Sequence, residues 1–304
     1  MQHRSAGTAR FALAGLLGLA LFVATTEAGA FCRSTTCKAE TEDCQPDEHG
    51  CSRLGAPHRW RAMPLVYRFS SRRSGLLLPE EARAAIRAAF HRWSDTRCSD
   101  GRTSLRFVEG EDIAEDKPLE AQAVASEPFG IFYRDLGWPY LGKQDSTLAQ
   151  TNTRAGKKSG FIEYADIEIN SGARRFSLSD APTDEDLGAG ADLQAVMTHE
   201  VGHYIGLAHS DEPSSIMVAD YCDRPDARCS KGKAAARRLS QDDIDAVCTI
   251  YPPGARAEAG EPPSESGCAV ASGASSTSST LLVLCAVAGC ALALARRCST
   301  WLTR

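Results

Sequence analysis

The amino-acid sequence predicts an α+β domain, because short strand patterns come first along the chain and the clearest helices follow them. Runs of β-branched and aromatic residues, bounded by turn-forming residues, are typical of strands. Apolar residues at helical spacing indicate one helix early in the domain and two late in it. An apolar content of 43% with 24% charged residues is that of an ordinary globular protein, which argues against a disordered chain.

Five segments of the domain are predicted to be strands. The last two look like a pair joined by a turn that contains Gly and Lys. An acidic loop with several glycines is expected at 180–192, after the last of these strands. The predicted strands are residues 64–69, 105–108, 130–133, 148–154 and 161–169.

Three segments are predicted to be helices. The first covers residues 79–93 and carries two glutamates in its first turn, where the helix dipole favours negative charge. The second runs over about 193–207, and the third over about 240–251. Ser240 with Asp243 three residues later is typical of a capping box at the start of that last helix.

Both ends of the chain are expected to lie outside the domain, which we assign to residues 59–253. Residues 1–30 have a basic start, an apolar run and small residues up to Ala30, as in a secretory signal peptide. Cleavage near Ala30 would give a secreted or cell-surface protein. Residues 254–280 are rich in Gly, Ala, Pro and Ser, which predicts a flexible linker, and residues 281–304 form a hydrophobic tail.

The charge of the chain argues against one class of partner. There are 34 basic and 39 acidic residues, giving a formal net charge of −5. No basic block occurs in the domain, so we expect no nucleic-acid partner. The oligomeric state is not indicated by the sequence.

Cysteine usage agrees with export. Eight of the 12 cysteines lie between the signal peptide and the linker, and an even number in an exported chain predicts disulfides. Four of them make residues 31–58 a stapled, Cys-rich N-terminal segment, for which a zinc knot is the alternative. Cys222 and Cys229 are close enough in sequence to bridge a short loop. The eight are Cys32, Cys37, Cys44, Cys51, Cys98, Cys222, Cys229 and Cys248.

One stretch of the second predicted helix carries metal-binding chemistry. His199 and His203 are four residues apart, so both rings leave the same face of a helix and can share one metal ion. Gly206 can end the helix in a left-handed conformation, after which His209 can return as a third ligand. Three histidines leave a fourth tetrahedral position for water, as in a catalytic zinc site. Glu200 is not needed as a ligand and can act as the general base.

This H-E-x-x-H-x-x-G-x-x-H pattern resembles the signature of the metzincin metallopeptidases, in which a Met-turn follows. Met217, in the run Ser214–Val218, stands where that turn is expected. Within the metzincins the chain is most similar to the matrixins. Features shared with that group are Ser210 after the third His, the strand at 165–170 and the closing R-x-L-S-x-D-D-I helix.

The resemblance implies a zinc endopeptidase domain with protein or peptide substrates. It implies a twisted mixed sheet with two long helices above a cleft, and the third His, the Met-turn and the C-terminal helix below it. Residues 148–153 would lie near the cleft, where an edge strand can pair with an extended peptide. The alternative is a surface-displayed binding or adhesive module with a structural zinc site, in which loss of Glu200 would be expected.

The chain also departs from the matrixin pattern. Matrixins commonly carry a pro-segment cysteine that caps the zinc, but Cys98 lies inside the catalytic region and is better explained as a disulfide cysteine. We therefore expect no cysteine switch, although residues 31–58 could mask the cleft. Ala219 stands where astacin-like relatives have a tyrosine ligand, and Tyr221 is expected to lie outside the metal's ligand set.

Two further features concern ions and anchoring. The acidic loop offers carboxylates for Ca²⁺, with a solvated loop as the favoured interpretation; they are Asp180, Asp184, Glu185 and Asp186. Gly267-Cys268, the apolar run and the terminal arginines resemble a bacterial sorting tag of the MYXO-CTERM type. A short membrane anchor is the alternative, and both would associate the protein with the cell envelope.

Overall fold

A computed structural model describes part of the chain, and all structural statements below concern that part. The described residues are 31–37, 44–45, 47, 51–113, 130–136, 138, 147–172, 175–179, 190–221 and 237–255. The predicted signal peptide, the predicted linker from residue 256 onward and the tail lie outside them, as do Cys222, Cys229 and the four acidic residues considered for calcium. Within the described ranges, no helix combines the length and the apolar character needed to cross a membrane.

The domain is built on a five-stranded mixed sheet with the strand order β4-β1-β5-β7-β6. All neighbouring strands are parallel except β6, which runs antiparallel to β7 and forms one edge of the sheet. Together with the helices this confirms the predicted α+β class. The strands are β1 (Leu65–Phe69), β4 (Phe107–Glu109), β5 (Gly130–Tyr133), β6 (Ala149–Ala155) and β7 (Ile162–Ile169).

Two short strand pairs were not predicted. They are β2 (Arg97–Cys98) with β3 (Gly101–Arg102), antiparallel, and β8 (Phe176–Ser177) with β9 (Ala191–Asp192), parallel. Strands of two residues have no periodicity that sequence can reveal, because the partner strand alone defines them.

Three helices occur at the predicted places: α1 (Pro79–Ser94), α3 (Leu193–Tyr204) and α4 (Gln241–Ile250). The capping box of α4 is present, with Ser240 and Asp243 bonded reciprocally. The second helix was expected to reach residue 207 but ends at Tyr204. Gly206 has a φ of 101°, which a right-handed helix cannot continue through.

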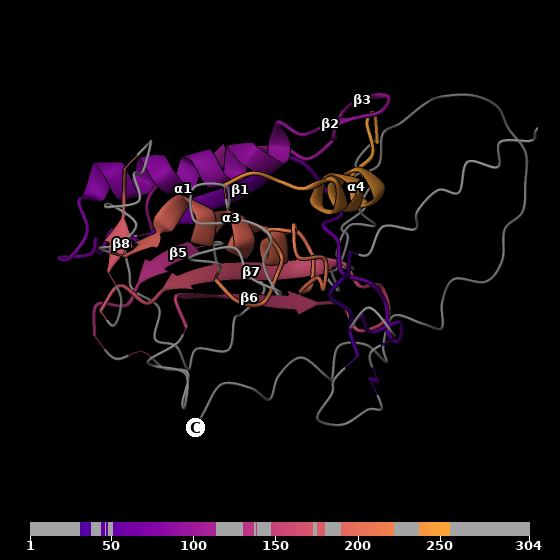
Figure 1. The fold of residues 1–304 in the computed structure, drawn as a ribbon, viewed down its shortest axis with the longest axis horizontal. Coiled ribbons are helices and arrows are strands. Elements are labelled where there is room, and N and C mark those ends of the chain that lie inside the picture. The colour runs from indigo at the N-terminus through magenta and orange to yellow at the C-terminus, as the bar shows by residue number, and fades with distance from the viewer. Residues whose placement is uncertain are drawn as a thin grey trace, which may run out of the picture. The chain divides into compact units, whose positions relative to one another are not determined.

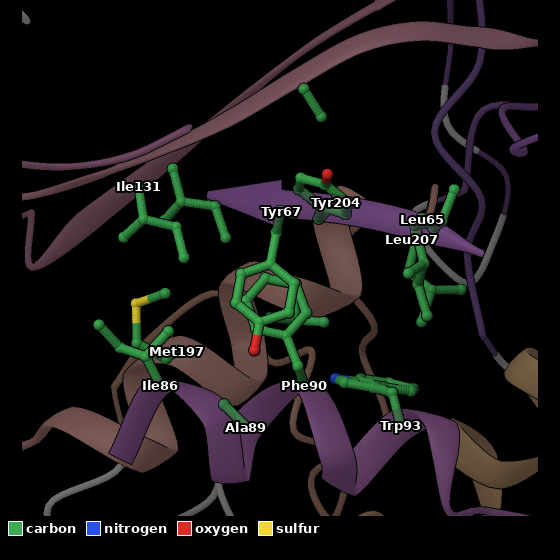
Figure 2. Close-up of a cluster of buried hydrophobic side chains, with 14 of the residues drawn as sticks. Leu65, Tyr67, Ile86, Ala89, Phe90, Trp93, Ile131, Met197, Tyr204 and Leu207 are labelled. Atoms are coloured by element: carbon green, nitrogen blue, oxygen red, sulfur yellow. The ribbon is translucent and has the colours of Figure 1, made fainter. Parts of the chain in front are cut away.

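Helices α1 and α3 lie side by side over the sheet (Figure 1). The indole Nε1 of Trp93 donates to the Thr198 carbonyl at 2.8 Å and ties the two helices together. Tyr67 of β1 stacks on Phe90 of α1 with ring centroids 4.0 Å apart, and Tyr204 of α3 lies next to them in the same core (Figure 2). This core fixes α3, and therefore its histidines, relative to the sheet.

Disulfides staple the described ends of the domain. Cys32 is bonded to Cys51 and Cys37 to Cys44, so disulfides are confirmed there and the zinc-knot alternative is wrong. A thiol oxidised to a disulfide has no thiolate left to bind a metal. A third bridge joins Cys98 of β2 to Cys248 of α4, which confirms Cys98 as a disulfide cysteine.

Candidate active site

Helix α3 is held at both of its ends by buried side chains. The carboxylate of Asp192 caps its N-terminus by accepting from the Ala195 amide at 3.2 Å, and also accepts from Arg237 Nε at 2.6 Å. At the other end, carbonyls without a helical partner are satisfied by side chains. The donors are Trp60 Nε1, to the Tyr204 carbonyl at 2.7 Å, and the Tyr251 hydroxyl, to the Ile205 carbonyl at 2.8 Å.

The three predicted histidines come together. Nε2 of His203 is 3.0 Å from Nε2 of His199 and 3.2 Å from Nε2 of His209. One ligand atom from each ring lies within 4.8 Å of the others. Converging Nε2 atoms of three imidazoles are a donor set that suits zinc.

Backbone carbonyls set the tautomer of two of these rings. His199 Nδ1 is 2.8 Å from the Ile216 carbonyl, and His203 Nδ1 is 2.9 Å from the Leu207 carbonyl. Because a carbonyl only accepts, Nδ1 carries the proton and Nε2 presents its lone pair to the shared point. Desolvation lowers the pKa of both His199 and His203 to about 4, so both rings are in the neutral, metal-binding form near pH 7.

Gly206 makes the turn that brings His209 back towards the helix. Besides its positive φ, a Cβ at this position would lie 2.5 Å from the His58 carbonyl oxygen. The position therefore has no room for another residue, for both conformational and steric reasons. The predicted role of this glycine is supported by its backbone geometry.

Met217, the residue predicted to form a Met-turn, packs against α3. It is 2% exposed, and a Cβ on Gly202 would fall 2.2 Å from its sulfur. Its carbonyl accepts from the Ser210 amide at 2.9 Å, next to the third histidine. Met217 thus contacts α3 at a position between the first two histidines, and it also contacts the loop that carries the third histidine.

Asp243 has a second role that the sequence did not reveal. Beyond capping α4, its carboxylate accepts from the Ile216 amide at 2.9 Å and from the hydroxyl of Ser215. It also accepts from the Ser240 amide at 2.7 Å. Since the Ile216 carbonyl orients His199, Asp243 supports a histidine from outside the motif.

Glu200 is buried next to the histidines, and Thr151 of β6 is its partner. The Thr151 hydroxyl lies 2.6 Å from Glu200 Oε2 and 3.0 Å from the Glu200 carbonyl. Burial raises the pKa of Glu200, and the hydrogen bond from Thr151 opposes that rise. Thr151 was recognised only as part of a strand, because a contact across 49 residues leaves no mark in local spacing.

A cavity of about 550 Å³ opens onto these groups. It is lined by β6 with the residues just before it, by α3, and by residues 215–216 and 218–221, with all three histidines and Glu200 in its wall. Tyr221 also lines the cavity, and its hydroxyl accepts from the Asp192 amide at 2.8 Å. Its contact with the helix cap shows a structural role near the site.

Comparisons with known proteins agree with this geometry. A family model described as Matrixin matches residues 59–252. Matrix metalloproteinase-C of Caenorhabditis elegans is 29% identical over 195 residues, covering 64% of this chain and 28% of that protein. Human matrix metalloproteinase-19 is 28% identical over 193 residues, covering 64% and 30%. Human matrix metalloproteinase-25 is 45% identical over a shorter stretch of 64 residues, 21% of this chain and 10% of that protein. The chain thus spans less than a third of the length of these relatives.

Proposed function

The chain belongs to the matrixin family, and from that premise we propose that it is an exported zinc-dependent endopeptidase with Glu200 as its general base. The observation that carries the proposal is the convergence of three histidine Nε2 atoms at an open cavity beside a buried carboxylate. His199, His203 and His209 would hold the zinc. When bound there, zinc would supply Lewis-acid polarisation and a lower pKa for water, towards about 7.

The residues of the chain provide the proton transfers and the orientation. Glu200 accepts a proton from the attacking water and then gives it to the departing nitrogen of the cleaved peptide bond. Thr151 donates to Glu200 Oε2, so one oxygen is held and the carboxylate has a fixed orientation.

The substrate class follows from the position of β6. Among the residues that the structure describes, this strand pairs with β7 alone, so its other edge is an outer edge of the sheet there. Leu148, Gln150 and Thr151 of the same segment line the cavity. A free strand edge beside the site fits an extended peptide, bound by main-chain hydrogen bonds.

The alternative, a binding or adhesive module with a structural zinc, is less well supported. A structural zinc site is closed by a fourth protein ligand. In the described part of the chain the cluster of metal-binding side chains consists of three histidines and faces a cavity.

Export is supported by the three disulfides, since such bonds persist in oxidising compartments. We also propose that Cys268 marks the point at which the tail is processed. For the acidic loop we propose a solvated loop, with calcium binding as the less favoured alternative. Mass spectrometry of the cell-envelope form tests the tail: a C-terminus at Arg304 would favour a plain membrane anchor.

The decisive experiment measures zinc content by atomic absorption together with turnover of a quenched peptide. Glu200→Gln should keep zinc and lose activity by a factor on the order of 10² to 10⁴, because only the base is removed. His209→Ala should lose both zinc and activity. His91→Ala is the matched control, because His91 is exposed on α1 and outside the cavity wall. A Glu200→Gln protein that cleaves the peptide at the unmodified rate would refute Glu200 as the base.

A further inference from the structure

The N-terminal segment contacts the chain between the second and third histidines. We propose that the N-terminal arm, residues 31–37 and 51–58, positions His203 and His209 for metal binding, with Ser34 as the positioning side chain. The ligand loop is defined here as residues 206–209. The inference rests on the zinc site proposed above and adds residues from outside the motif.

The arm pairs with the ligand loop through the main chain. The Ser34 amide donates to the Gly206 carbonyl at 2.9 Å, and the Ala208 amide donates to the Cys32 carbonyl at 2.9 Å. Arg33 and Leu207 form an antiparallel bridge between these two bonds. Ala208 immediately precedes His209. Its hydrogen bond to the arm therefore holds the backbone just before the third histidine in place.

Ser34 also reaches His203 through one shared carbonyl. Its hydroxyl donates to the Leu207 carbonyl at 2.9 Å, and the same oxygen receives Nδ1–H of His203 at 2.9 Å. A carbonyl oxygen has two lone pairs, and these two donors use both. Ser34 thus fixes the acceptor that orients the ring, and Ser34 itself lines the cavity. Groups that orient a ligand histidine in this way usually affect metal affinity.

Residues 51–58 of the arm hold residues 31–37 in place. The His58 amide donates to the Ser34 carbonyl at 2.7 Å, and Arg33 Nη2 donates to the His58 carbonyl at 2.7 Å. The same His58 carbonyl lies against Gly206. The ligand loop is therefore covered on one side by backbone of the arm, instead of standing alone as an irregular loop.

The two disulfides of the arm differ in their distance from the ligand loop. Cys32 supplies the carbonyl that accepts from the Ala208 amide, and its disulfide to Cys51 ties that residue to the 51–58 part of the arm. Cys37 is bonded to Cys44, further along, and its amide donates within the arm to Thr35. If the arm positions the ligands, the first bridge should matter for zinc and the second should matter only for local stability.

The test measures how fast zinc passes from the folded, exported protein to a chromophoric chelator. The double variant Cys32→Ser/Cys51→Ser should release zinc roughly 10 to 100 times faster than the unmodified protein, the usual effect of losing support around a metal ligand. Its matched control, Cys37→Ser/Cys44→Ser, should release zinc within about twofold of the unmodified rate.

A second pair keeps the test informative if a disulfide variant fails to fold. Ser34→Ala removes the hydroxyl that reaches the ligand loop, and it should speed zinc release by roughly tenfold. Thr36→Ala is its control, because the Thr36 hydroxyl accepts from the Ala56 amide inside the arm. Its release rate should match that of the unmodified protein.

The outcomes separate this inference from the proposed function. Zinc release at the unmodified rate by folded Ser34→Ala would overturn the positioning role. Equal acceleration by Thr36→Ala would overturn Ser34 as the positioning side chain, because loosening of the arm and not loss of the Ser34 hydroxyl would then account for the faster release. Failure of the proposed function is a different result, namely unmodified protein without zinc, or a His209→Ala variant that retains it.

Discussion

The two sides of the cavity are built in different ways. The regular side consists of β6 and α3, whose backbone hydrogen bonds form a ladder and a helix. The irregular side consists of residues 205–221, which form neither a helix nor a strand. Both sides supply groups to one site, yet the irregular side has no ladder or helix of its own and depends more on individual side chains for its shape.

Strand β6 shows how the regular side is held. It pairs with β7 over its whole length, from Ala149 opposite Ile169 to Ala155 opposite Ile162. Loss of one side chain leaves this ladder intact. On the irregular side, the carboxylate of Asp243 takes the place of a ladder, because it binds the amide and hydroxyl donors that fix the turn before Met217. A single buried carboxylate therefore satisfies donors that the backbone carbonyls of a neighbouring strand would satisfy in a sheet.

The largest expected effect comes from the bridge that ties α4, and with it Asp243, to the rest of the domain. Cys98 and Cys248 are 150 residues apart, and the chain-entropy relation gives about 5 kcal/mol for a loop of that length. Cys37 and Cys44 are 7 apart, which gives about 2 kcal/mol. Urea unfolding of the two double-serine variants under non-reducing conditions measures both losses. Equal losses would contradict the larger contribution assigned here to the Cys98–Cys248 bridge.

The next effect concerns Asp243 itself. Asp243→Asn places an amide NH₂ among donors from Ile216 and Ser240, so at least one buried donor loses its acceptor. We expect a loss of about 3 kcal/mol in the free energy of unfolding. Asp245→Asn, on the exposed side of the same helix, should cost less than about 0.5 kcal/mol. Similar losses for the two variants would contradict the special role given to Asp243.

Gly206 allows conformational and steric effects on the irregular side to be separated. Gly206→Ala meets both a φ of 101° and the His58 carbonyl oxygen 2.5 Å from its Cβ. Gly254→Ala meets a φ of 70° but no atom within 4 Å. We expect about 1 kcal/mol for Gly254→Ala and about 2–3 kcal/mol for Gly206→Ala, with weaker zinc binding only in the latter. Thermal unfolding with zinc titration distinguishes them, and equal costs would remove the steric argument.

Local signals explain why much of the regular side was predictable. Helix α1 begins at Pro79 as expected, because proline and two glutamates mark a helix start within one turn. The three histidines were found for the same reason: a helix turn and a glycine fix their relative positions within eleven residues. The short range of these constraints is what makes them readable in a single sequence.

The contacts that the sequence did not reveal all cross long distances along the chain. Thr151 meets Glu200 across 49 residues, and Ser34 meets Leu207 across 173. Threonine and serine are common in strands and loops alike, and their spacing does not tell which distant carbonyl or carboxylate they will reach. The ligand loop was therefore predicted from its own residues, while the arm that covers it was recognised as a disulfide-stapled segment that could mask the cleft, and not as a support of that loop.

The smallest effect on stability is expected for Glu109, on strand β4 of the regular part of the fold. Hydrogen bonds from Arg87 and Arg83 lower the pKa of Glu109 from its ordinary value of 4.5 to about 2. Because the folded-state pKa is the lower one, this contribution to stability is fully present above about pH 4.5 and is lost as the pH falls through 2. Glu109 is partly exposed, so water screens the pairs and Glu109→Gln should cost less than about 1 kcal/mol at pH 7.

The pH dependence provides the measurement. Urea unfolding of the unmodified protein and of Glu109→Gln should differ by a constant amount between pH 6 and 7, and the two curves should converge from about pH 4.5 downwards. A difference that stays constant to pH 2.5 would mean that Glu109 acts through packing and not through its charge. A cost at pH 7 as large as that of Asp243→Asn would contradict the comparison itself. A partly exposed charge on a paired strand would then contribute as much stability as a buried one on the irregular side.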